Sequence, residues 1–142
     1  MKFMHALVCI GIVLLPACSQ QSFEEKVVTG GGKKMTNGDL VALFAKPVVY
    51  DYQFVNVPAQ RGTVSTEPGG SVTLKWVYFV TDNSNKGSDS GTWRIDKDSF
   101  CIKWKESNKG QESCNTWYRT KDLGYTTVRM TGEPGAYIEF KP

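Results

Sequence analysis

After residue 47, hydrophobic and polar residues alternate one by one over most of this 142-residue chain. Tyr50, Tyr52 and Phe54, for example, are separated by Asp51 and Gln53. Successive side chains of a β-strand point to opposite faces, so this alternation predicts strands with one buried and one solvated face. The same pattern recurs at 72–81, 92–96 and 100–105, and further strands are expected near 61–66, 113–119, 124–130 and 136–140.

Short segments rich in Gly, Pro, Asn and Asp separate these strands, and such segments are typical of β-turns. About eight short strands joined in sequence order predict a mainly β fold. We expect a small antiparallel meander, closed as a barrel or folded as a sandwich. The turn segments lie at 67–70, 82–87, 96–98, 108–110 and 132–135.

One short N-terminal helix is expected before the sheet, at about residues 37–45. Thr36 can accept a hydrogen bond as the N-cap, and Asp39 stands where the partner residue of a capping box belongs. Leu40 and Phe44 then recur at helical spacing. The helix is therefore predicted to dock through this apolar face.

The first 17 residues are interpreted as a secretory signal peptide. Lys2 precedes an unbroken run of ten apolar residues at 6–15. As a helix, that run spans only about 15 Å, which is half of the hydrocarbon core of a bilayer. The sequence Leu-Pro-Ala-Cys-Ser follows at 15–19 and resembles the lipobox of bacterial lipoproteins. An ordinary secretory signal with an incidental cysteine is the alternative.

The lipobox resemblance implies cleavage before Cys18, a diacylglycerol on its sulfur and acylation of the freed amine. Two or three acyl chains hold a protein on a membrane essentially permanently. In Gram-negative lipoproteins the next residue directs sorting, and Ser19 is of the permissive kind. The resemblance therefore implies attachment to the inner leaflet of the outer membrane, with the domain facing the periplasm.

Residues 18–35 contain a Gly triplet and show no sustained periodicity. This segment is predicted to be the lipidated flexible tether, in which a brief strand at 27–28 is the one element the residues suggest. Residues 36–142 are predicted to form the β-rich globular domain.

Cys101 and Cys114 lie on the two arms of one predicted hairpin. In an oxidising periplasm such a pair is expected to form a disulfide. Closing a loop of about 14 residues stabilises the fold by roughly 3 kcal/mol in the chain-entropy model. A redox-active pair is the alternative, but the cysteines lack the Cys-x-x-Cys spacing.

The most distinctive stretch begins with Gly-Thr-Trp at 91–93 and continues through Cys101 to Trp104. Cys114 then follows with aromatic residues close behind it. This arrangement resembles a proteobacterial family known as domain of unknown function 995, over roughly residues 36–129. The resemblance implies a small exported protein with a short helix and a β-rich region, and it implies no activity.

Aromatic residues make up 12% of the chain, which is enough to suggest a stacking platform for sugars or peptides. Three tryptophans, however, fall on the apolar faces of their strands and are predicted to be buried; these are Trp76, Trp93 and Trp104. The best candidates for an exposed contact surface are Trp117, Tyr118 and Arg119, because either face of their strand could be the outer one.

Several catalytic chemistries are disfavoured by the residues themselves. The single histidine, His5, is expected to leave with the signal peptide. The mature chain then has no histidine for a Ser-His-Asp or Cys-His site or for a His-ligated metal. Asp96 and Asp98 could face each other across a turn, but a turn on a small barrel offers no glycosidase cleft. We interpret them as turn-shaping residues.

Metal and nucleic-acid binding are likewise not expected. The segment 82–89 is rich in oxygen ligands, but Lys86 occupies a ligand position and the bidentate Glu of an EF-hand is missing. It is predicted to be a solvated loop. The 17 Lys and Arg residues are interleaved with 14 Asp and Glu residues, which is typical of a solvated surface.

These observations favour a lipid-anchored periplasmic module for binding or envelope maintenance, without catalytic residues, cofactor or metal. Its expected partners are the membrane, through Cys18, and an envelope protein or glycan. An inhibitor of a wall-degrading, lysozyme-like hydrolase is the alternative by analogy of architecture. A carboxylate-dependent enzyme acting on envelope polysaccharide is a third hypothesis.

Overall fold

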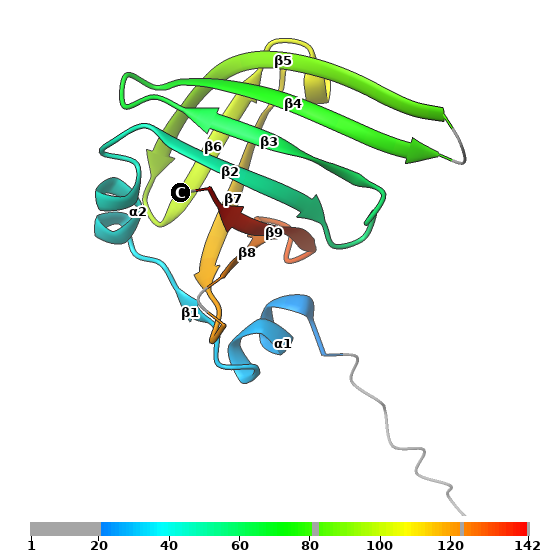
Figure 1. The fold of residues 1–142 in the computed structure, drawn as a ribbon. Helices are drawn as coiled ribbons and strands as arrows, with labels where there is room; N and C mark the ends of the chain where they lie inside the picture. Colours follow the sequence, from blue (N-terminus) through cyan, green and yellow to red (C-terminus); the bar gives the residue numbers. More distant parts are fainter. Residues whose placement is uncertain (1–20, 81–82, 123, 142) are drawn as a thin grey trace, which may run out of the picture.

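A computed structural model shows the protein as a closed, eight-stranded antiparallel β-barrel with one extra short strand and two short helices (Figure 1). The structure describes residues 21–80, 83–122 and 124–141. The prediction of a mainly β meander is confirmed, and the barrel is the form that it takes.

Eight consecutive strands each pair with the next, and β9 closes the ring by pairing with β2. Closure leaves the barrel without an open edge, which removes the exposed backbone donors and acceptors of an edge strand. The barrel strands are β2 (Val48–Phe54), β3 (Gln60–Thr66), β4 (Ser71–Val80), β5 (Asn83–Asp96), β6 (Ser99–Trp104), β7 (Glu112–Arg119), β8 (Tyr125–Arg129) and β9 (Pro134–Phe140).

The alternation seen in the sequence becomes the inside and outside of this barrel. Along β2, Val48, Tyr50 and Tyr52 are buried, whereas Val49 and Gln53 are exposed. An eight-stranded barrel is just wide enough for side chains to fill its interior, so the core lies inside the ring of strands. Trp76, Trp93 and Trp104 pack against this core, but each is only half-buried rather than fully buried.

Helix α2 (Asn37–Leu43) packs against the barrel core, as its apolar spacing predicted. Thr36 and Asp39 form the expected capping box. Leu40 is fully buried, and Phe44, the residue that ends the helix, is 1% exposed. The Phe44 ring stacks on Phe100 with centroids 4.3 Å apart. These contacts make α2 part of the hydrophobic core.

The prediction of a flexible spacer over residues 18–35 is wrong for the described part of that segment. Helix α1 (Phe23–Thr29) occupies its middle, where a strand at 27–28 had been suggested. Strand β1 (Lys33–Lys34) follows and pairs with the end of β7. Between residue 21 and the barrel, the described chain therefore contains two short α-helices rather than one. A capping box of Ser22 and Glu25 begins α1, and Glu24 on this helix contacts Tyr118 of the barrel.

A second correction concerns the segment expected to be a solvated loop at 82–89. Residues 83–89 belong to β5, which pairs with β4 from Val80↔Asn83 to Ser71↔Thr92. Pairing with β4 gives the backbone N–H and C=O groups of this segment partners that water would provide in a solvated loop. The β4–β5 hairpin is consequently the longest in the barrel (Figure 1).

Candidate binding site

One row of directly paired residues crosses six neighbouring strands of the barrel. Tyr125 on β8 is the partner of Ile138 on β9, which in turn is the partner of Tyr52 on β2. The row continues through Gly62 on β3 and Trp76 on β4, and it ends at Gly87 on β5. The chain thus places aromatic rings and glycines side by side, although they are far apart in the sequence.

The two glycines leave room for the neighbouring rings. A Cβ on Gly87 would lie 2.1 Å from a ring carbon of Trp76, so this indole lies directly over the glycine. A Cβ on Gly62 would lie 2.8 Å from the Tyr52 ring and 2.3 Å from the Lys75 carbonyl oxygen. Cross-strand neighbours stand only about 5 Å apart, so no side chain fits at these two positions.

A hollow with a volume of about 1290 Å³ follows this row. Short runs from β2, β3, β4, β5 and β9 line it, and the β7–β8 turn lies at its other end. It is somewhat larger than the roughly 300–1,000 Å³ of typical small-molecule sites. The aromatic residues among its lining are Tyr52, Trp76, Tyr125, Tyr137 and Phe140.

Charged side chains of both signs accompany these rings, and they balance. The acids are Asp51, Asp122 and Glu139, and the bases are Arg61, Lys75 and Lys86. A hollow without a dominant charge does not select for a strongly anionic or cationic ligand.

Asp51 is already engaged by protein groups within the hollow. Its carboxylate accepts a hydrogen bond of 2.5 Å from the Thr63 hydroxyl and lies 3.1 Å from the Lys141 ammonium. Burial raises the pKa of the nearby Tyr52 phenol to about 12. That phenol therefore stays protonated at neutral pH and can act as a hydrogen-bond donor.

The sequence-predicted contact surface of Trp117, Tyr118 and Arg119 is wrong for its two aromatic members. Trp117 is 2% exposed and lies at the centre of the barrel, where its ring meets Tyr50 edge-on at 5.5 Å. Tyr118 points to the other face of β7 but is only 1% exposed. Only Arg119 is exposed.

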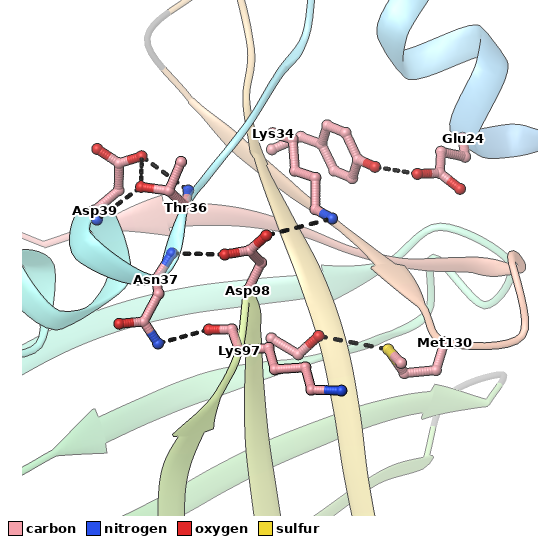
Figure 2. A network of polar contacts seen from close by, with 10 residues as sticks. Glu24, Lys34, Thr36, Asn37, Asp39, Lys97, Asp98 and Met130 are labelled. Atoms are coloured by element: carbon pink, nitrogen blue, oxygen red, sulfur yellow. Dashed lines mark hydrogen bonds and ion pairs between the residues drawn. The ribbon is translucent and has the colours of Figure 1, made fainter.

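The N-terminal segment contacts Tyr118 through both β1 and α1, because Lys34 of β1 is its strand partner. The Tyr118 phenol donates a hydrogen bond to the Glu24 carboxylate on α1, which reaches across to the barrel (Figure 2). Alternation along β7 had left open which face was the outer one. It could not show that an N-terminal segment covers that face.

The predicted disulfide between Cys101 and Cys114 is present in the structure. The two residues are direct partners across the β6–β7 pair, so the strand register brings their sulfurs together. Within the described residues, one group of possible metal ligands gathers, namely these cysteines with Glu112. Because the two sulfurs are bonded to each other, they are not available as thiolate ligands.

Asp89 lies in the segment whose oxygen ligands resemble a calcium loop, but its carboxylate links two parts of the chain. It is buried, and its carboxylate accepts hydrogen bonds from the backbone N–H groups of Ser90, Glu106 and Ser107 at 2.7 to 3.4 Å. These bonds attach β5 to η1 (Ser107–Gly110), the 3-10 turn between β6 and β7. A second hollow of about 440 Å³ lies beside Asp89.

Asp96 and Asp98 flank the β5–β6 turn, as the sequence suggested, and each has its own partner. Asp96 pairs with Arg94 at 3.1 Å. Asp98 accepts a 2.8 Å hydrogen bond from the Asn37 backbone N–H and lies 3.8 Å from the Lys34 ammonium (Figure 2). Asp98 therefore attaches β1 and the first turn of α2 to the barrel.

Cys18, the predicted lipidation site, lies outside the described residues. Among the helices that the structure does describe, none has the length and apolar character needed to cross a bilayer. No protein-family model, curated protein or solved structure matches this chain.

Proposed function

We propose that this protein is a lipid-anchored periplasmic binding module, held at the inner leaflet of the outer membrane through Cys18. The lipobox-like sequence at 15–19 and the permissive Ser19 support this location. The disulfide between Cys101 and Cys114 supports an oxidising compartment, because such bonds rarely persist in a reducing one.

The hollow along the Tyr52–Trp76 row is the binding site in this proposal, and it is the observation that carries it. Rings of graded exposure line it: Tyr52 is buried, Trp76 and Tyr125 are half-buried, and Tyr137 is exposed. Apolar ring faces combined with balanced polar groups fit an uncharged, hydroxyl-rich ligand with an apolar face, as a sugar ring has. We therefore favour an envelope glycan as the ligand.

A role in binding rather than catalysis is also supported by the contacts that Asp51 and Asp98 make within the protein. Glycoside hydrolysis needs one protonated and one ionised carboxyl on opposite sides of a bond. Asp51 pairs with Lys141, and Asp98 pairs with Lys34 and the backbone of Asn37. Each of these carboxylates already has partners within the protein, so neither is presented alone to a ligand as an acid or a base.

The location is tested by the substitution Cys18→Ala in the full chain. The variant should lose its fatty acyl groups and leave the outer-membrane fraction, because no acyl chain then holds it. Fractionation and mass spectrometry of the mature amino terminus measure both effects. Recovery of the variant in the outer membrane, at the level of the unaltered protein, would refute the anchor.

The binding site is tested with soluble peptidoglycan fragments, using tryptophan fluorescence and calorimetry. Trp76→Leu should weaken binding by about fivefold or more, if a sugar face on this ring contributes as much as a stacked base, which is about 1–3 kcal/mol. Trp104→Leu is the matched control, because Trp104 is also half-buried but does not line the hollow. Equal weakening in both variants would contradict the site. Capture of one stoichiometric lysozyme-like protein instead of glycan would favour the inhibitor.

A further inference from the structure

The chain leaves very little freedom between the proposed lipid and the first docked residue. Ser22 is the N-cap of α1, and its side chain and that of Glu25 form a reciprocal capping box. Only four residue steps separate Ser22 from Cys18. Even fully extended, four residues reach at most about 14 Å. The start of α1 must therefore remain close to whatever surface holds Cys18.

The segment from α1 to the barrel is attached at every stage. Glu24 accepts the hydrogen bond from the Tyr118 phenol, and Gly32 N–H donates to the Val27 carbonyl at 2.9 Å. β1 then pairs with β7, and the Met35 N–H donates to the Trp117 carbonyl at 2.9 Å. Helix α1 is therefore linked to the barrel both by the Glu24–Tyr118 hydrogen bond and through β1.

The same end of the molecule carries a defined set of exposed side chains. We call it the α1 face: Lys26 of α1, Lys33 of β1, and Lys121 of the β7–β8 turn, whose side chain lies against Gly31. Val28 is 53% exposed but is two residues from Lys26, so it points to another side of the helix and is not part of this face. In Figure 1, α1 and β1 lie at the opposite side of the barrel from β4 and β5.

We propose that the α1 face rests on the phospholipid surface that holds the anchor, so that the barrel has a fixed orientation on the membrane. This inference rests on the lipid anchor of the proposed function. The short connection supplies the orientation. Net charge adds little to the attraction between the α1 face and the membrane, because the three lysines share this end of the molecule with three acids. These acids are Glu24, Glu25 and Asp122. The lysine stems can nevertheless lie along the interface while their ammonium groups meet anionic headgroups.

This orientation also gives the hollow a direction. Its β7–β8 end, with Thr120 and Asp122, adjoins Lys121 of the α1 face. Its other end is lined by Lys86 and Gly87 of β5, the strand labelled at the opposite side of the barrel from α1 in Figure 1. The hollow accordingly extends away from the membrane, toward the space in which a periplasmic glycan lies.

Lysine footprinting tests the orientation on the full lipidated protein in vesicles of phosphatidylethanolamine and phosphatidylglycerol. The reference is a variant with a Gly-Ser insertion of about 12 residues after Gln20, which adds a mean reach of about 20 Å while keeping the anchor. Lys26, Lys33 and Lys121 should react several-fold more slowly with an amine-acylating reagent in the unaltered protein than in the insertion variant. The exposed control lysines Lys75, Lys86 and Lys105 should react at equal rates in both.

Different outcomes refute the lipid anchor and the orientation of the barrel. If Cys18 carries acyl groups and the protein floats with the vesicles, but all six lysines react at equal rates in both proteins, the orientation is refuted while the anchor stands. If the amino terminus carries no acyl group and the protein does not float, the anchor is refuted and the orientation with it. Slower reaction confined to the α1 face supports both.

Discussion

At the scale of single residues, Asp89 shows how one buried charge organises a connection. Burial alone would raise the pKa of Asp89, but the hydrogen bonds from the N–H groups of Ser107, Ser90 and Glu106 outweigh it. They lower the pKa below its ordinary value of 3.8. Hydrogen bonds to an ionised acceptor are about twice as strong as neutral ones. The β6–β7 connection is therefore held through the charged form of this side chain.

Asp89→Asn should destabilise the fold by about 1–2 kcal/mol at pH 7. Because the folded pKa is lowered, the contribution of Asp89 is fully present above its unfolded pKa of about 3.9 and is lost as the pH falls through the folded pKa. The stability gap between the two proteins should therefore narrow below about pH 4. Urea unfolding at several pH values measures this gap.

Asp96→Asn serves as the control for this prediction, since Asp96 forms an exposed ion pair with Arg94. Exposed pairs contribute little, so the control should change stability by less than about 1 kcal/mol at any pH. A gap between Asp89→Asn and the unaltered protein that stays constant from pH 7 to pH 3 would contradict the role given to Asp89.

At the scale of elements, α1 is a short helix that the sequence signals locally. Ser22 and Glu25 stand at capping-box spacing, and Gly30 to Gly32 follow the helix. These signals were available in the residues, but a seven-residue helix is too short for periodicity to reveal. Its docking on Tyr118 is tertiary, because the partner lies 94 residues away in the sequence.

Tyr118→Phe should loosen α1 and leave the barrel intact. The variant keeps the buried ring but removes the phenol that donates to Glu24. Backbone amides within Phe23–Thr29 should exchange with solvent about fivefold faster or more, which corresponds to a local loss of about 1 kcal/mol. Hydrogen exchange with mass spectrometry measures this rate. Tyr137→Phe is the control, because Tyr137 is 54% exposed on β9. Unchanged exchange in α1 would show that the Glu24 contact does not hold the helix.

At the scale of the whole molecule, closure between β2 and β9 turns a meander into a barrel. Residues near the end of the chain return to the first barrel strand, where Ile138 pairs with Tyr52 and Phe140 pairs with Tyr50. Beyond β9, the Lys141 N–H donates to the Val49 carbonyl at 2.9 Å. This seam completes the core and also assembles the row that lines the hollow.

Neighbouring substitutions on β9 test the importance of this seam. Ile138→Ser should cost about 2–4 kcal/mol, because Ile138 is 6% exposed within the core. Tyr137→Ser should change stability by no more than about 0.5 kcal/mol, because its ring faces solvent. Urea unfolding compares the two variants. A similar loss in both would mean that β9 does not have the assigned inside and outside.

The sequence alone was sufficient for most of the barrel strands, the capped helix α2 and the pairing of Cys101 with Cys114, but not for β1 or the first half of β5. Each of the correctly predicted features depends on neighbours along the chain, through alternation, capping residues or a single hairpin. The exposure of Trp117 and Tyr118 could not be obtained in this way. Trp117 is buried because closure of the barrel places it at the centre, and Tyr118 is buried where β1 and α1 contact it.

The candidate site likewise could not be predicted from the sequence. Tyr52, Gly62, Trp76 and Gly87 are unremarkable in the sequence, and they form a row only once the register of four strands is known. Local backbone preference and side-chain alternation depend only on short stretches of residues. Which stretches meet, and which face remains open to a ligand, depends on contacts between distant segments, and the folded barrel alone decides these.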